Sequence, residues 1–147
     1  DLHAPERIMI SANRHLSEYR NLGVEVVPDR WPDHPGPFAG LVTLFSVLRG
    51  AALLTVPVDA QRLPQDFVAR MRSHPGEEAL HVVVAEDDDG LQPLFARYPA
   101  AVAAHANESY EAGTRSVREW QHCFPIHVCR FPDWRFGNLN SIEDMGK

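Results

Sequence analysis

Short apolar runs alternate with stretches of helical periodicity along this chain. The runs that we expect to form strands are 8–12, 24–27, 52–58, 80–85, 91–96 and 126–131. The stretches that we expect to be helices are 15–22, 38–48, 63–73, 99–112 and 116–123. Most of the runs are largely apolar, as in strands that are buried on both faces, and helices separate them. The pattern predicts an α/β fold of three layers, with a mainly parallel sheet between helices.

Polar residues follow three of the apolar runs. Asn13, Asp29 and Asp59 stand near the ends of the first, second and third runs. In sheets of this kind ligands bind beyond the carboxyl ends of the strands. Asn13 and Asp29 suit hydrogen bonds to a base or a sugar, and the carboxylate of Asp59 suits Mg²⁺. Each residue also has an ordinary alternative as a helix cap or a turn residue.

A loop rich in proline precedes the second helical stretch. Gly36 and Gly40 flank the start of this helix, and Pro37 suits its first turn. Small residues there let a ligand approach the free N–H groups of a helix N-terminus, which suit a phosphate or a polar base. An ordinary tight junction between a loop and a helix would use the same residues.

Composition narrows the classes of function. The 147 residues fit one domain, and 44% hydrophobic with 23% charged residues excludes a disordered or fibrous chain. A net charge of −6 argues against a general binder of nucleic acid or anionic membranes. No apolar run is long enough to span a membrane. Lys147 is the only lysine, so an internal catalytic lysine is excluded for this chain.

The two cysteines lie close to two histidines. His122, Cys123, His127 and Cys129 fall within one short segment, but their spacing is not that of a zinc site. We expect these thiols to be buried and reduced, in a cytoplasmic protein without a disulfide framework. The chain also lacks the glycine-rich dinucleotide motif, the P-loop, the serine hydrolase elbow and the zincin motif.

Six short motifs occur in one order along the chain. They are Ser11-Ala12-Asn13-Arg14, Val27-Pro28-Asp29, Gly36-Pro37-Phe38-Ala39-Gly40, Val56-Pro57-Val58-Asp59, Leu91-Gln92-Pro93-Leu94 and Asn138-Leu139-Asn140-Ser141-Ile142-Glu143-Asp144. Each motif alone is weak, but together they resemble the molybdenum cofactor guanylyltransferase family over essentially the whole chain. That family belongs to the α/β proteins that resemble nucleotide-diphospho-sugar transferases.

The resemblance implies an enzyme that transfers GMP from GTP to molybdopterin, with Mg²⁺, and releases pyrophosphate. It implies that Asn13, Asp29 and the segment Gly36–Gly40 bind GTP, and that Asp59 binds both GTP and Mg²⁺ as the catalytic residue. Gln92, Asn138 and Asn140 fall where molybdopterin is expected. Two alternatives stay open: a sibling that transfers CMP from CTP to the same cofactor, and a non-catalytic module that binds the cofactor.

The chain departs from the family at its beginning. The family starts with a central strand and a glycine-rich loop whose Arg and Lys hold the triphosphate, and this chain has no such segment. We therefore expect residues 1–147 to be a single nucleotidyltransferase-like domain that is incomplete at its N-terminus. Without the central strand, the runs 8–12 and 52–58 would lack a shared neighbour. We also expect a monomer that serves molybdoenzymes or their chaperones.

Overall fold

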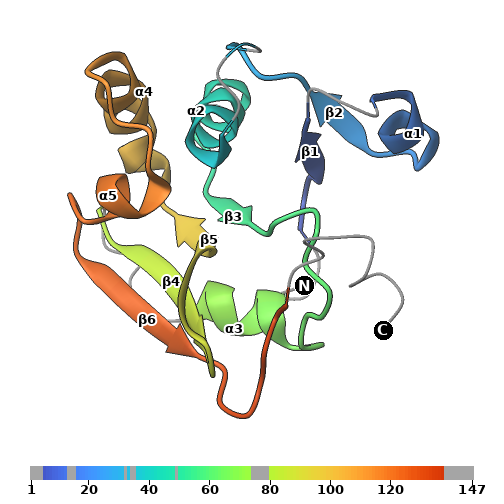
Figure 1. The fold of residues 1–147 in the computed structure, drawn as a ribbon, viewed down its shortest axis with the longest axis vertical. Coiled ribbons are helices and arrows are strands. Elements are labelled where there is room, and N and C mark those ends of the chain that lie inside the picture. Colours follow the sequence, from blue (N-terminus) through green and yellow to red (C-terminus); the bar gives the residue numbers. More distant parts are fainter. Residues whose placement is uncertain are drawn as a thin grey trace.

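A computed structural model of the chain describes residues 5–12, 16–31, 33, 36–48, 50–73 and 80–137. The strands are β1 (Met9–Ser11), β2 (Glu25–Val27), β3 (Leu53–Thr55), β4 (Val82–Asp87), β5 (Gly90–Tyr98) and β6 (Ile126–Arg130). The helices are α1 (Leu16–Asn21), α2 (Pro37–Val47), α3 (Phe67–Ser73), the 3₁₀ turn η1 (Ala100–Val102), α4 (Ala103–Glu111) and α5 (Val117–Gln121). The predicted α/β class is confirmed (Figure 1).

The described strands form two separate sheets. β1 and β2 pair in parallel, and the other four strands have the order β3-β5-β4-β6. Within the larger sheet β4 and β6 are parallel, but β5 is antiparallel to both β3 and β4. The prediction of a mainly parallel sheet is therefore wrong for the described strands, because the four-stranded sheet is mixed. The reason is the two-residue turn Asp88–Asp89, because so short a connection can only join antiparallel strands.

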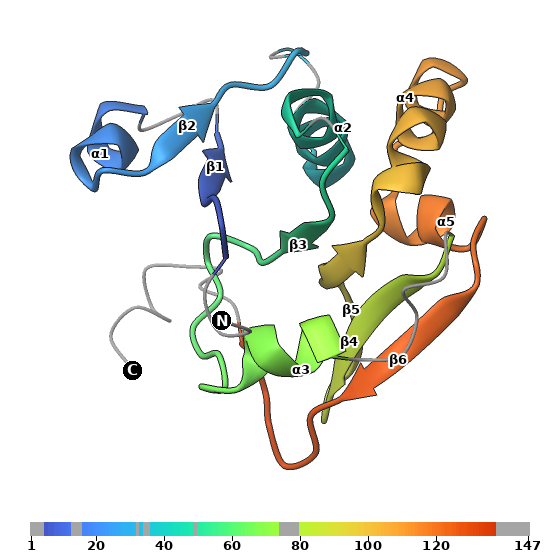
Figure 2. The ribbon, with the colours of Figure 1, turned by 180° about the vertical axis from the view of Figure 1, so that it is seen from behind.

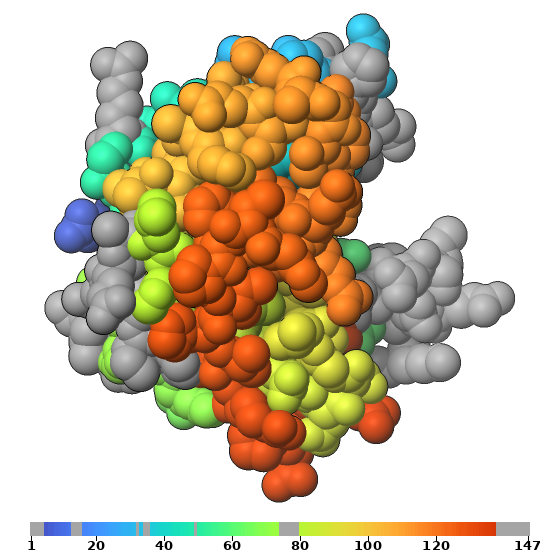
Figure 3. Space-filling model, turned by 90° about the vertical axis from the view of Figure 1, so that its left-hand side faces the viewer, coloured from blue at the N-terminus to red at the C-terminus, as the bar shows by residue number. Residues whose placement is uncertain are grey.

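Helices cover both faces of the four-stranded sheet, as the three-layer prediction requires. Val82 and Val84 of β4 pack in a core with α2, α4 and α5. Val83 and Ala85, which alternate with them, pack in a second core with α3. Successive side chains of a strand point to opposite faces, so one apolar strand can fill both cores. Figure 3 shows the outer surface, where β6 lies beside the hairpin of β4 and β5.

Two prolines of the four-stranded sheet stand where regular strand pairing stops or shifts. The run 52–58 forms a strand only as far as Thr55, since Pro57 begins a turn in which the Ala60 N–H donates to the Pro57 carbonyl at 3.2 Å. In β5, the register with β4 shifts between Val84 and Ala85, opposite the segment that contains Pro93. Proline has no N–H for a sheet ladder and is therefore found at edges and irregular positions.

Helix α2 lies between the two sheets. It follows β2, leads into β3, and stands between β1 and α4 in both views (Figures 1 and 2). Among the described residues, β1 pairs only with β2, and β3 pairs only with β5. No described helix is long and apolar enough to cross a membrane.

Candidate functional site

Three segments meet at the carboxyl end of the small parallel sheet. The Ser11 hydroxyl, at the end of β1, donates to Oδ1 of Asp29 at 2.9 Å. A Cβ placed on Gly40, in α2, would lie 2.9 Å from Ser11 Oγ and 3.4 Å from Asp29 Oδ1. Any side chain at position 40 would therefore collide with this pair. The sequence keeps glycine there because the helix passes directly against two polar side chains.

The local sequence explains why these segments meet. Ser11 is the register partner of Val27, and the Ala12 N–H donates to the Val27 carbonyl, so the two parallel strands end level with each other. Asp29 follows β2 by two residues and therefore lies beside the end of β1. Parallel strands thus bring polar residues from distant parts of the chain to one edge.

The first turn of α2 lies beside Ser11 and Asp29. Gly36 is the residue before the helix and Pro37 occupies its first turn, where a missing N–H costs nothing. The Gly36 carbonyl accepts a hydrogen bond from the Gly40 N–H at 3.4 Å. The first turn of a helix presents free N–H groups and a positive dipole, which suit a phosphate or a polar base. Of the predicted nucleotide residues, Asp29, Gly36, Pro37 and Gly40 thus lie at one place, while Asn13 lies outside the described residues.

Asp59 stands in the connection between β3 and α3. It occupies the exposed Pro57–Ala60 turn, four residues beyond the end of β3 rather than directly at it. Within the described part of the chain, its carboxylate has no hydrogen bond or ion pair, and no group of three or more metal-binding side chains occurs. Mg²⁺ commonly takes one or two protein carboxylates and fills its other positions with water and substrate phosphates. A single, accessible carboxylate such as that of Asp59 fits this donor set.

Gln92 is the one predicted molybdopterin residue that the structure describes. Its side-chain amide donates to Oδ1 of Asp87 at 3.0 Å, next to the turn between β4 and β5. Asn138 and Asn140 lie outside the described residues. The residue before Asn138 is Gly137, whose carbonyl accepts a hydrogen bond from the Gln61 N–H at 3.2 Å. The chain that leads to Asn138 thus runs beside the loop that carries Asp59.

The segment that contains the two cysteines is described in the structure, and its side chains differ in burial and contacts. Cys129 is buried in the core against α3, and this burial raises the pKa of its thiol. The ring nitrogens of His127 and His81 lie 2.8 Å apart. Cys123 is exposed, unlike the prediction that both thiols are buried, because it stands in a surface turn two residues beyond the end of α5.

Comparison with known proteins adds to this geometry. The family model described as "MobA-like NTP transferase domain" matches residues 2–125, which is most of the chain. The chain belongs to this family. The resemblance drawn from the six motifs is thereby confirmed.

Relatives and solved structures agree with the family. A protein named "Molybdenum cofactor guanylyltransferase" from Cupriavidus pinatubonensis is 31% identical over 144 residues, which covers 94% of this chain and 72% of that protein. One of the same name from Burkholderia orbicola is 32% identical over 150 residues, with 95% and 73% covered. The structure of "Molybdopterin-guanine dinucleotide biosynthesis protein A" from Archaeoglobus fulgidus matches with a TM-score of 0.67 at 15% identity, covering 94% and 74% of the two chains. A structure from Aquifex aeolicus matches with a TM-score of 0.78 at 16% identity, covering 92% and 72%. These two likenesses show the fold.

The structure adds two site residues that the sequence prediction did not single out. Ser11 is bonded to Asp29, and a polar residue at the end of an otherwise apolar run was the available signal. Asp87 holds Gln92 and is only 4% exposed. It stands within the acidic run 86–89, which reads as an exposed turn. Nothing in that run distinguishes the buried carboxylate from its neighbours.

Proposed function

We propose that this protein is a molybdenum cofactor guanylyltransferase, which transfers GMP from GTP to molybdopterin and releases pyrophosphate. The observation that carries the proposal is the match, at 31–32% identity, to proteins of that name over 94–95% of the chain. The meeting of Ser11 and Asp29 at the start of α2 supports it, because polar side chains beside a helix N-terminus suit a nucleotide.

We propose that the nucleotide binds beside Asp29, at the carboxyl end of the small parallel sheet. The Asp29 carboxylate can only accept hydrogen bonds, so it suits the N–H donors of a base or the hydroxyls of a ribose. The hydrogen bond from Ser11 fixes the orientation of that carboxylate at 2.9 Å. The absence of a side chain at Gly40 lets α2 pack against this pair, and the first turn of α2 offers free N–H groups to a polar ligand.

We propose that Asp59 holds the metal ion. Its exposed carboxylate can bind Mg²⁺ together with the phosphates of the nucleotide. The ion, when bound, would stabilise the negative charge that develops during the attack on the α-phosphorus. The remaining work of catalysis is the positioning of the two substrates, which is the main task of the protein in phosphate transfer.

We propose that a further strand with a glycine-rich loop lies between β1 and β3 and holds the triphosphate. Each of these strands has one described partner, so each leaves an edge whose backbone groups lack a partner strand in the described part of the chain. Backbone N–H groups in such a loop would supply the phosphate contacts. The chain covers 72% of the length of the relative from Cupriavidus pinatubonensis.

A transfer assay on the full-length protein tests the proposal. Purified protein, Mg²⁺, molybdopterin and GTP labelled at the α-phosphorus should yield labelled dinucleotide cofactor and one pyrophosphate for each transfer. Parallel reactions with CTP identify the base. Transfer from CTP alone would identify the cytidylyl sibling, and cofactor binding without any transfer would identify the non-catalytic module. Either result would contradict the proposal.

A further inference from the structure

The last residue of β4 is a buried carboxylate. Asp87 is 4% exposed and accepts three hydrogen bonds. Oδ1 accepts from the Asp89 N–H at 2.9 Å and from the Gln92 side chain at 3.0 Å, and Oδ2 accepts from the Phe136 N–H at 3.0 Å. A buried carboxylate is costly unless donors surround it. These three donors, from two distant parts of the chain, tie the segment at 136 to the hairpin.

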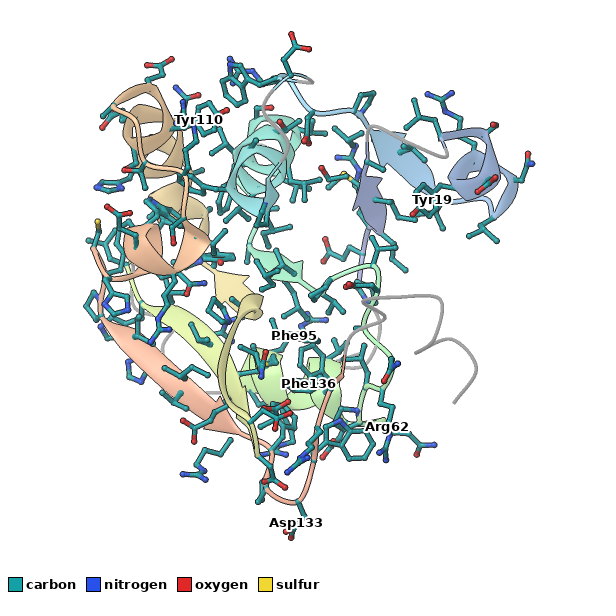
Figure 4. All side chains as sticks on the ribbon, in the orientation of Figure 1. Tyr19, Arg62, Phe95, Tyr110, Asp133 and Phe136 are labelled. Carbon is teal, nitrogen blue, oxygen red and sulfur yellow. The ribbon has the colours of Figure 1, made fainter. Side chains whose placement is uncertain are left out.

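The residues next to this bond continue the connection. The Phe136 carbonyl accepts from the Arg62 N–H at 3.0 Å, and the Gly137 carbonyl accepts from the Gln61 N–H at 3.2 Å. The Phe136 ring is 1% exposed and stacks on Phe95 at 4.3 Å between ring centroids. Figure 4 shows Phe95 and Phe136 side by side at the centre of the molecule. The segment is thus held on its N–H side by Asp87 and on its carbonyl side by the loop after β3.

Gly137 lies in close contact with Gln61. Gly137 has a φ of +66°, and a Cβ built on it would lie 2.7 Å from Oε1 of Gln61. The backbone conformation therefore favours glycine, and a side chain here would also displace the Gln61 amide. Gln61 is two residues beyond Asp59, and Gly137 is the residue before Asn138. The two backbone hydrogen bonds from Gln61 and Arg62 to Gly137 and Phe136, called the bridge below, thus connect the loop of Asp59 with the segment that leads to Asn138.

We propose that Asp87 is a positioning residue for the transfer reaction. Its carboxylate fixes Phe136 and Gly137, and these residues set the loop that carries Asp59 relative to the segment that enters Asn138. This inference rests on the proposed function, because it assigns GTP with its metal to one side of the bridge and molybdopterin to the other. The reacting atoms must be brought into line, and a misplacement of about 1 Å can cost a hundredfold in rate.

The variant Asp87→Asn in the full-length protein tests this role. The amide keeps the size of the carboxylate but has one acceptor oxygen, so its NH₂ group must face an N–H donor. We expect kcat for GMP transfer to fall by about tenfold to a hundredfold, while the KM for GTP changes by less than about threefold. We also expect the amides of Gln61, Arg62 and Phe136 to exchange faster with solvent, as followed by NMR, while those of β6 do not change.

Asp89→Asn is the matched control. It removes the same charge from the same turn, but the Asp89 side chain is about half exposed and pairs only with Arg135, at 3.5 Å, among the described residues. We expect unchanged kcat and unchanged exchange. Gly137→Ala is the second test, because it disturbs the bridge at its other end without altering the Asp87 carboxylate. We expect it to lower kcat in the same way as Asp87→Asn.

The outcomes separate the inference from the proposed function. Faster exchange with unchanged kcat in Asp87→Asn would overturn the positioning role, and unchanged exchange would overturn the bridge itself. If Asp87→Asn does not fold, a normal kcat in Gly137→Ala overturns the inference and a reduced one supports it. A wild-type protein that transfers no GMP would contradict the proposed function, and the exchange rates would still show whether Asp87 holds the bridge.

Discussion

The two sheets of this molecule differ in how many of their residues are buried. In the four-stranded sheet, β4 buries Val82–Ala85 completely and contributes to cores on both faces. In the two-stranded sheet, β1 has no fully buried residue, β2 buries only Val27, and α1 buries none of its residues. The larger sheet therefore carries most of the buried apolar area, which is the main source of stability.

The nucleotide site that we propose lies beside the small sheet, which is the less buried of the two. Ser11 ends β1 and Asp29 follows β2, and this region is tied to the larger core through α2 and through Trp31, which stacks on Tyr110 of α4. Regions with little burial open locally at low free energy, and binding segments often come from them. The comparison indicates that substitutions in the larger sheet will affect folding, and that substitutions near β1 and β2 will affect ligand binding.

The largest effect is expected at the centre of the larger core. Trp120 is completely buried, packs against Phe38 and Tyr98 with centroids 5.4 Å away in each case, and donates from its ring N–H to His105. Trp120→Ala should lower the free energy of unfolding by about 3–5 kcal/mol. Trp31→Ala is the control, since Trp31 is half-buried and stacks only on Tyr110 among the described aromatic rings, and it should cost about 1 kcal/mol. Equal losses in urea denaturation would contradict the comparison.

The second-largest effect is expected on the rate of catalysis, with no change in the stability of the fold. Asp59→Asn removes the charge that we propose holds Mg²⁺, so GMP transfer by the full-length protein should fall about a hundredfold, or about 3 kcal/mol. Because Asp59 is exposed and has no partner among the described residues, the midpoint of thermal unfolding should not change. Asp66→Asn, which removes an exposed charge from the same connection, should keep full activity. An unchanged rate and an unchanged Mg²⁺ dependence in Asp59→Asn would contradict the proposal that Asp59 binds the metal ion.

A smaller effect is expected at the proposed nucleotide site. Gly40→Ala places a methyl group 2.9 Å from Ser11 Oγ, so the Ser11–Asp29 pair must move. We expect affinity for Mg·GTP, measured by calorimetry, to fall about tenfold, because a displaced pair loses one good hydrogen bond to the ligand. Ser46→Ala is the comparison, since Ser46 is exposed near the other end of the same helix. A loss as large in Ser46→Ala would show that the close contact at Gly40 is not what matters.

The smallest effect is electrostatic and lies on the surface of the small sheet. Arg7 donates two hydrogen bonds to Glu25, and this pairing holds the pKa of the Glu25 carboxyl below its usual value. A lowered pKa in the folded state stabilises the protein above the usual pKa of the carboxyl, and this contribution is lost as the pH falls through the lowered value. NMR titration should show the low pKa, and Arg7→Ala should return it to normal. Since both side chains are exposed, overall stability should barely change.

The fold was largely predictable from the sequence, because apolar runs and helical periodicity fix the elements. The direction of β5 was not predictable, because the residues of the run 91–96 do not indicate which strand they pair with. The short turn Asp88–Asp89 makes β5 antiparallel to β4. In the site, the glycines and Asp29 follow from motifs. The bond between Ser11 and Asp29 and the burial of Asp87 do not, because both depend on residues that are far apart in the chain.

Hydrogen exchange of the full-length protein with and without Mg·GTP tests the central contrast most directly. We predict that the nucleotide slows exchange of the amides at the ends of β1 and β2 and in the first turn of α2. The amides of β4 and β6, which the larger core protects, should exchange slowly in both states and change little. Protection that appears mainly in β4 and β6, or none at all around Ser11, Asp29 and Gly40, would contradict the account.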